Sequence, residues 1–572
     1  MFDVIIRGGD VVDGTGARRR RADVGLRDGR IAAIGELTGE ADTVIDAAGK
    51  VVTPGFVDVH THFDAQVFWD ASLSPSPLHG VTTVMAGNCG FSIAPLSSDP
   101  ADAEYLMRML ARVEGMPLES LRQAVPWSWK STADYFDAIE GNLGVNAGFM
   151  IGHSAIRRVA MGADATEREA TPEELAAIGR LLHEGLEAGG IGFSSSWSRS
   201  HNDAEGRMVP SRRAHRDELL EMARITGTHE GTSLEFIPMI GQFEPWAVEL
   251  MADMSAAARR PLNWNVLAVN AAGLDRARQA LEAGDVARAR GGRVVALSPS
   301  MSFGIRLSLA SGFVLDAMPE WDQAMGLPRA EKLALFRDPE ARGRLDQAAQ
   351  RPDNMLRGLA NWSRMVIFDV VADDNRAFVG RTVGEIAADQ GRAPWDVLCD
   401  IAVADELLTS FGLPDPEDTD DDWRARLEIV RDSRALIGAS DAGAHLDMLA
   451  SFNYATVLLG EAVRKRGLLP LEEAIQLITD APARLYGLVE RGRVEEGWHA
   501  DLVVLDPATV GSESVSMRFD LPGGSGRLYA TATGIDHVLV NGRPIVTDGA
   551  LTTERAGTLL RSGRDTTTPE LG

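Results

Sequence analysis

The stretch PGFVDVHTHFD, residues 54–64, sets histidines and carboxylates among residues that favour β-strands. On an extended strand alternate side chains share a face, so Asp58, His60 and His62 point one way while Val59 and Thr61 between them point the other. Imidazole and carboxylate groups are ligands for Zn²⁺ and similar ions. At the mouth of a barrel this pattern predicts a metal site, whereas the HxH spacing alone is also typical of a hydrogen-bonded or surface pair.

Two further stretches carry residues that can do chemistry. In VMAGNCGFSIAP, residues 84–95, Cys89 follows an apolar run and is either a buried small residue or a thiolate ligand. In IGASDAGAHLDM, residues 437–448, Asp441 ends another apolar run. A carboxylate at that place can hold a metal ion and transfer a proton, or it can cap a helix.

The elements that must position these residues alternate between strand and helix. One clear helix is TPEELAAIGRLLHEGLEAGG, residues 171–190, where Thr171 is the expected N-cap and Gly189 and Gly190 end the pattern. Eight strand candidates are spaced along the chain, at 56–62, 82–87, 146–154, 191–196, 233–240, 261–268, 293–300 and 435–443. Eight parallel strands with intervening helices predict an α/β fold, a (β/α)8 TIM-like barrel with its polar residues at the C-terminal strand ends.

The two chain ends have a different texture. Residues 1–53 and 490–572 consist of short β-patterned pieces separated by turn residues, including the hairpin signal Asn541-Gly542. We expect them to form one small composite β-sandwich domain beside a barrel of residues 54–489. Residues 301–434 are too long for one connection, so they predict an insertion before the last barrel strand, a partly helical lid.

Composition excludes several classes of function. Asp and Glu number 83 against 57 Lys and Arg, which gives a net charge of −26 and a pI near 4.9. Such a protein repels nucleic acids and anionic membranes, and the one basic run, ARRRRAD at 17–23, is predicted to be a solvated hairpin turn. No run of apolar residues is long enough to span a membrane, and two cysteines argue against a disulfide framework. A cytoplasmic protein is therefore expected.

Taken together, PGFVDVHTHFD, GNCGFSIAP, MIGHSAIR, IGFSSSWS and SDAGAH resemble the amidohydrolase superfamily, and within it the N-acyl-D-amino-acid deacylases, or D-aminoacylases. The resemblance covers nearly the whole chain. It implies a barrel enzyme with one or two divalent ions, Zn²⁺ above all. It also implies that His60, His62, Cys89 and Asp441 bind metal and that Asp441 acts as the acid and base.

The sequence departs from the family at two strands. The family has a metal-binding histidine on each of strands 5 and 6, but SLEFIPMI and PLNWNVLA contain none, and their polar residues are Glu235, Asn263 and Asn265. Two arrangements are open: His60, His62 and Asp441 hold the ion with Cys89 or a water, or His201 moves in as a replacement.

The reaction implied is hydrolysis of an amide in an N-acyl amino acid-like small molecule, by metal-activated water with Asp441 as general base and acid. A cyclic amide, a lactone or another scissile bond is the alternative, as is a non-catalytic homologue. Substrate contacts are expected from His153, Arg199 and His201, although His153 also suits a structural role. Arg157 and Arg306 are further candidates for binding a carboxylate. A homo-oligomer is expected.

Overall fold

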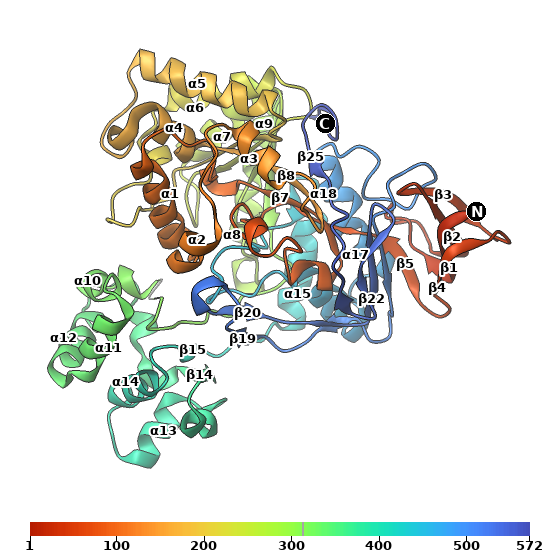
Figure 1. Cartoon of the computed structure of the whole chain (residues 1–572). Helices are drawn as coiled ribbons and strands as arrows, with labels where there is room; N and C mark the ends of the chain where they lie inside the picture. Colours follow the sequence, from red (N-terminus) through yellow and green to blue (C-terminus); the bar gives the residue numbers. More distant parts are fainter. Residues whose placement is uncertain (312–313, 572) are drawn as a thin grey trace.

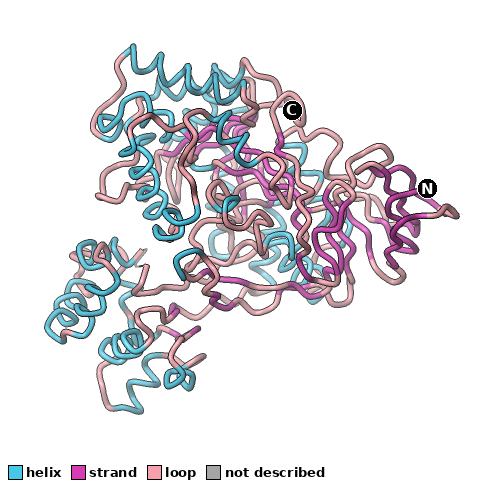
Figure 2. The backbone as a smooth tube through the Cα atoms, viewed as in Figure 1, coloured by secondary structure: helices cyan, strands magenta, loops and turns pink. Residues whose placement is uncertain are grey.

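The computed structural model describes residues 1–311 and 314–571 (Figures 1 and 2). It contains a strand-helix barrel, a β-sheet made from both chain ends, and a helical lobe that projects from the barrel (Figure 1). The barrel strands in chain order are β6 (Phe56–Asp58), β7 (Val81–Ala86), β8 (Asn146–Phe149) continued by β9 (Ile151–Gly152), β10 (Gly192–Ser196), β11 (Ser233–Ile237), β12 (Pro261–Trp264), β13 (Arg293–Ser298) and β16 (Ala435–Ile437).

The barrel strands form a closed ring. Neighbours pair in parallel from β6 to β8 and from β9 to β16, with β16 beside β13 across the insertion. At the interruption between β8 and β9, the N–H of Ile191 donates to the carbonyl of Phe149 at 2.9 Å. The ring closes where the N–H of His62 donates to the carbonyl of Ala442 at 2.7 Å. The predicted (β/α)8 barrel is confirmed, and its C-terminal strand ends share one mouth.

Helices cover the outside of this ring (Figure 2). The helix predicted at 171–190 is α5 (Pro172–Glu187), and a reciprocal capping box between Thr171 and Glu174 fixes its start. The other covering helices are α1 (Pro100–Val113), α4 (His153–Met161), α6 (Arg216–Gly227), α7 (Pro245–Ala258), α8 (Leu274–Ala280), α9 (Glu282–Ala289), α15 (Asp420–Val430), α17 (Leu471–Ile478) and α18 (Asp480–Leu485). Within residues 1–311 and 314–571, no helix is both long and apolar enough to cross a bilayer.

The chain ends meet in one sheet, drawn in red and dark blue in Figure 1. Its hydrogen-bonded order is β24-β23-β22-β17-β5-β1-β2-β3, with β4 also paired to β1. The contact that joins the two ends is the antiparallel pairing of β5 with β17. The strands are β1 (Phe2–Val11), β2 (Arg20–Arg27), β3 (Arg30–Gly35), β4 (Ala41–Asp46), β5 (Val51–Pro54), β17 (Leu502–Leu505), β22 (Ile535–Val540), β23 (Arg543–Thr547) and β24 (Ala550–Leu551).

Two details of this sheet bear on the sequence predictions. Asn541 and Gly542 both have positive φ, 47° and 77°, as a tight type I′ hairpin between β22 and β23 requires. Beyond the sheet, β25 (Leu559–Leu560) pairs with β8, so the last residues reinforce the barrel wall instead. The C-terminal segment therefore serves both structures.

The insertion forms a lobe with its own apolar core. Its elements are α10 (Trp321–Met325), α11 (Arg329–Arg337), α12 (Pro339–Ala349), α13 (Val383–Gln390), α14 (Pro394–Ala404), β14 (Val366–Asp369) and β15 (Ser410–Gly412). In Figure 1 these elements, green to teal, stand away from the barrel helices. α15 falls within the range 301–434, but its buried side chains, among them Trp423 and Ile429, belong to the barrel core. Trp321, Trp362 and Trp395 pack on one another inside the lobe.

Replacing Trp395 by alanine should destabilise the lobe without disturbing the barrel. The side chain is 4% exposed, its ring centroid lies 4.5 Å from that of Trp362, and its indole N–H donates to the carbonyl of Arg342 at 3.0 Å. Removing a buried tryptophan costs about 3–5 kcal/mol. We expect faster hydrogen exchange in α10–α14 and unchanged exchange in β10–β13, with Trp246→Ala, 36% exposed in α7, as the control. Equal loss of protection in the barrel would show that lobe and barrel unfold as one unit.

Candidate metal centre

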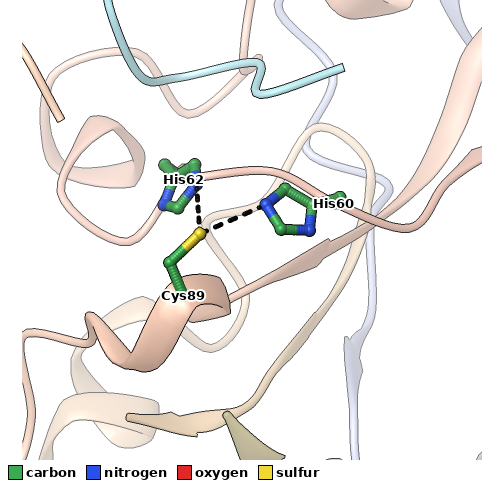
Figure 3. Close-up of side chains that lie close together, drawn as sticks. All are labelled: His60, His62 and Cys89. Carbon is green, nitrogen blue, oxygen red and sulfur yellow. Dashed lines mark hydrogen bonds between the residues drawn. The ribbon is translucent and has the colours of Figure 1, made fainter. Parts of the chain in front are cut away.

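The first barrel strand brings two imidazoles to the barrel mouth. β6 ends at Asp58, earlier than the alternating pattern predicts, and the chain continues past Thr61, which bridges Ala442. His60 and His62 are 0% and 1% exposed, and their ring centroids lie 5.4 Å apart. Their Nε2 atoms approach the same thiol (Figure 3). The two rings are therefore directed at a common point inside the protein.

That thiol belongs to Cys89, just beyond the end of β7. Its Sγ lies 3.4 Å from Nε2 of His60 and 3.7 Å from Nε2 of His62 (Figure 3). Cys89 has a φ of +58°, which is unusual for a residue with a side chain, and its N–H donates to Oε2 of Glu235 at 2.9 Å. Burial first, and then the nearby carboxylates, raises the pKa of this thiol well above its usual value. A cation at the same point would reverse that effect.

The trio has the dimensions of a tetrahedral zinc site. Bonds of about 2.3 Å to sulfur and about 2.0 Å to nitrogen, at the tetrahedral angle, separate those atoms by about 3.5 Å. The two observed separations of Sγ from Nε2 lie on either side of this value. Among the described residues His60, His62 and Cys89 form a cluster whose ligand atoms all lie within 4.8 Å of one another. Two imidazoles and a thiol are donors that Zn²⁺ prefers, so the residues fit the ion that the sequence predicts.

Asp441 lies at the same place, after β16. Its Oδ1 is 3.2 Å from Nε2 of His60 and 3.8 Å from Nε2 of His62. Burial acts to raise the pKa of Asp441, but the hydrogen bond with His60 and the neighbouring histidines outweigh it and bring the pKa to about 2. The side chain retains 21% exposure, so this carboxylate is ionised and reachable from the mouth.

Glu114 is the residue that the sequence reasoning missed. It follows α1 directly and is 3% exposed, and its Oε2 lies 3.5 Å from Nε2 of His62. Burial, followed by repulsion from Asp441, Asp64 and Glu235, raises the pKa of Glu114 well above its usual value. No motif marks it, because it reaches the mouth through the packing of α1 and not through a strand end.

Three polar residues lie on or just after the fifth and sixth barrel strands, and each makes different contacts: Glu235, Asn263 and Asn265. Glu235 on β11 accepts the Cys89 N–H, and its Oε1 is buried without a hydrogen-bond partner among the residues that the structure describes. Asn265, just after β12, places Nδ2 3.2 Å from Nε2 of His60 and 3.4 Å from Oδ1 of Asp441. Asn263 points elsewhere, donating to the carbonyl of Leu234 and to the hydroxyl of Tyr486. Two of the three residues therefore face the centre.

His153 is held by protein groups on both ring nitrogens. Its Nδ1 lies 2.8 Å from Oγ of Ser195 and its Nε2 lies 2.8 Å from Oε1 of Glu218. Glu218 also pairs with Arg157, whose side chain is fully buried. The sequence left both a substrate contact and a structural role open for His153, and this geometry favours the structural role. Arg157 is engaged by Glu218 in the same way.

The remaining candidates lie around the mouth. His201 is partly buried, and its Nδ1 is 2.8 Å from Oγ of Ser196. Its ring is near enough to Asp441, His60 and His445 to interact with them electrostatically, and burial lowers its pKa to about 3. Arg199 is exposed on the same loop. Arg306 pairs with Asp415 and stacks on Phe368 in the lobe, so it is engaged there.

The geometry can be compared with known proteins. Residues 43–546 match a model described as the Amidohydrolase family. D-aminoacylase of Alcaligenes xylosoxydans xylosoxydans is 29% identical over 98% of this chain and 97% of its own. A D-aminoacylase structure from a study of its binuclear metal centre has a TM-score of 0.64 at 28% identity, covering 98% of this chain and 100% of that one. The structure of N-acyl-D-glutamate deacylase from Bordetella bronchiseptica, complexed with zinc and a phosphonate inhibitor, has a TM-score of 0.64 at 26% identity, covering 98% of this chain and 100% of that one.

The buried ion pair beside the centre generates a stability prediction. Glu218→Gln leaves Arg157 buried without a counter-charge, which should lower the free energy of unfolding by about 3–5 kcal/mol. Glu221→Gln on the same helix, where the side chain is 46% exposed, should change it by less than about 0.5 kcal/mol. Urea unfolding followed by circular dichroism measures both, and equal effects would contradict the structural role of the pair.

The same pair predicts a pH dependence. Burial acts to raise the pKa of Glu218, but His153 and Arg157 outweigh it and lower the pKa in the folded protein. The stabilisation is therefore complete above the ordinary glutamate pKa of about 4.3 and is lost as the pH falls through the lower folded value. The stability difference between wild type and Glu218→Gln should shrink over that acidic range.

Proposed function

The chain belongs to the amidohydrolase family, and from this membership we propose that it hydrolyses the amide bond of an N-acyl amino acid or a related small molecule with a divalent ion held at the candidate metal centre. The observation that carries the proposal is the convergence of His60, His62, Cys89 and Asp441 on one point of the barrel mouth. These side chains come from strands far apart in the chain, and the barrel brings the ends of those strands to one mouth.

Zinc is the ion that we propose, because the donor set includes a thiol and two imidazoles. Lewis acidity is what zinc supplies in such a site, by making water a nucleophile at neutral pH and by polarising an amide carbonyl. The relatives support the choice, since one of the solved structures contains zinc. The protein's own contribution is to fix the ligands: the barrel backbone sets the two histidines, and Glu235 holds the Cys89 N–H.

Asp441 is the proposed general base and acid. With a pKa near 2 its carboxylate is ionised at neutral pH, so it can accept a proton from the attacking water at an Oδ atom. The same group then delivers that proton to the departing amine. Asn265 supports this role, because its Nδ2 lies 3.4 Å from Oδ1 and can hold the carboxylate in place.

Recognition of the substrate is assigned to the loop after β10. Arg157 and Arg306 are both paired with carboxylates of the protein, so Arg199 and His201 remain as the proposed contacts for the substrate. The names D-aminoacylase and N-acyl-D-glutamate deacylase make N-acyl-D-amino acids the first substrates to test.

A substrate panel tests the proposed reaction. The purified full-length protein is offered N-acetyl-D- and N-acetyl-L-amino acids, hydantoins and lactones, and release of amine or acid is measured with and without a chelator. We expect release of amine from a linear amide, loss of that activity after chelation, and recovery with added Zn²⁺. Turnover of hydantoins or lactones alone would exclude the linear amide, and full activity in the chelated protein would exclude the metal.

Asp441→Asn tests the proton transfer. The amide side chain cannot accept a proton, so kcat should fall by about 10²–10⁴-fold, while zinc measured by mass spectrometry should stay bound to His60, His62 and Cys89. Asp421→Asn, an exposed aspartate on α15, is the matched control and should retain wild-type kcat. A fully active Asp441→Asn variant would refute the role.

A further inference from the structure

We propose that Glu114 is a ligand of the ion in the metal centre, so that the donor set is two histidines, one cysteine and one glutamate. The proposal rests on the divalent ion of the proposed function. It adds a carboxylate donor from the end of α1 to the trio of His60, His62 and Cys89.

The position of the carboxylate supports this role. Bonds of about 2.0 Å to nitrogen and about 2.1 Å to oxygen, at the tetrahedral angle, separate the two ligand atoms by about 3.4 Å. Oε2 of Glu114 lies 3.5 Å from Nε2 of His62. Asp441 is nearest to the other imidazole, at 3.2 Å from Nε2 of His60. The distance from Glu114 to His62 is thus the separation expected of two ligand atoms bound to one ion.

Among the residues that the structure describes, the Glu114 carboxyl group has no basic side chain beside it except an imidazole. Glu114 is 3% exposed, and in the described part of the chain its ion-pair partner is His62 alone, with no lysine or arginine within 4.0 Å. Buried charges are paired or bind metals. A divalent ion between His62 and Glu114 satisfies both groups, because each presents a lone pair to the space between them.

The backbone of Glu114 is held in place by hydrogen bonds within the protein. Its N–H donates to the carbonyl of Leu110 at 2.9 Å, and its own carbonyl accepts the N–H of His445. The next residue, Gly115, has a φ of +56°, and a Cβ there would lie 3.2 Å from Cα of His445. The end of α1 is therefore fitted closely to the loop that carries Asp441. The backbone that carries Glu114 is thus fixed beside the centre, which limits the positions that its carboxylate can reach.

Metal binding by the full-length protein tests the proposal. After removal of bound metal, the affinity for Zn²⁺ is measured by competition with a chromophoric chelator, and Co²⁺ is added to record the visible spectrum. We expect Glu114→Gln to weaken Zn²⁺ binding at least tenfold and to alter the Co²⁺ ligand-field bands. The thiolate-to-cobalt charge-transfer band from Cys89 should remain. Glu119→Gln, an exposed glutamate in the first turn of α2 (Leu118–Ala124), should change none of these.

The outcomes separate this proposal from the proposed function. Unchanged Zn²⁺ affinity and an unchanged Co²⁺ spectrum in Glu114→Gln would overturn it, even if activity were lost. Circular dichroism and thermal unfolding of the metal-free variants establish that they fold, and Glu114→Asp, which keeps the charge, should recover part of the affinity. A wild-type protein that binds Zn²⁺ but cleaves no amide would defeat the proposed function and leave Glu114 as a ligand.

Discussion

The structure depends on one electrostatic constraint, a buried concentration of acidic groups around two imidazoles. Cys89, Glu114, Glu235 and Asp441 interact within the same closed space, and none of these residues is neutralised by a lysine or arginine among the described ion pairs. Without a cation, burial and the neighbouring carboxylates raise the pKa values of Cys89, Glu114 and Glu235 well above their usual ranges, which disfavours their ionised forms. A divalent ion bound among these groups would stabilise their ionised forms. The arrangement therefore fits the proposed ion-binding site, and the fold can be understood by how it holds these groups together.

Backbone strain gathers at the same point. Cys89, Ala439, Asp441 and His445 all have positive φ, although none of them is a glycine. Such conformations cost of order 1–3 kcal/mol each, and they persist where the surroundings determine them fully. Here the surroundings are the barrel closure between His62 and Ala442 and the docking of α1 on His445. The sheet of the chain ends and the core of the lobe lie outside this region and contribute the ordinary packing that offsets the strain.

The sequence was sufficient to predict those site residues that lie at the ends of barrel strands. His60, His62, Cys89 and Asp441 each follow an apolar run, and parallel strands bring their carboxyl ends to one mouth, so these four were foreseeable and the structure brings them together. Glu114 was not foreseeable, since α1 lies in a long excursion between β7 and β8 and local pattern says nothing of where its end docks. The role of Arg157 was also hidden, because its partner Glu218 is distant in sequence. The projection of the lobe, and the membership of α15 in the barrel, likewise depend on long-range packing.

The absence of histidines on β11 and β12 changes what that half of the barrel does. Glu235 uses one carboxylate oxygen to hold the Cys89 N–H, and Asn265 donates toward Asp441 beside His60. These strands thus orient the proposed ligands instead of binding the ion themselves. In the proposed donor set the ligand atoms come from the segments that follow β6 and β7 and from the end of α1. With four protein donors, water and substrate can reach the ion only if the shell expands to five ligands, as it does in some catalytic zinc sites.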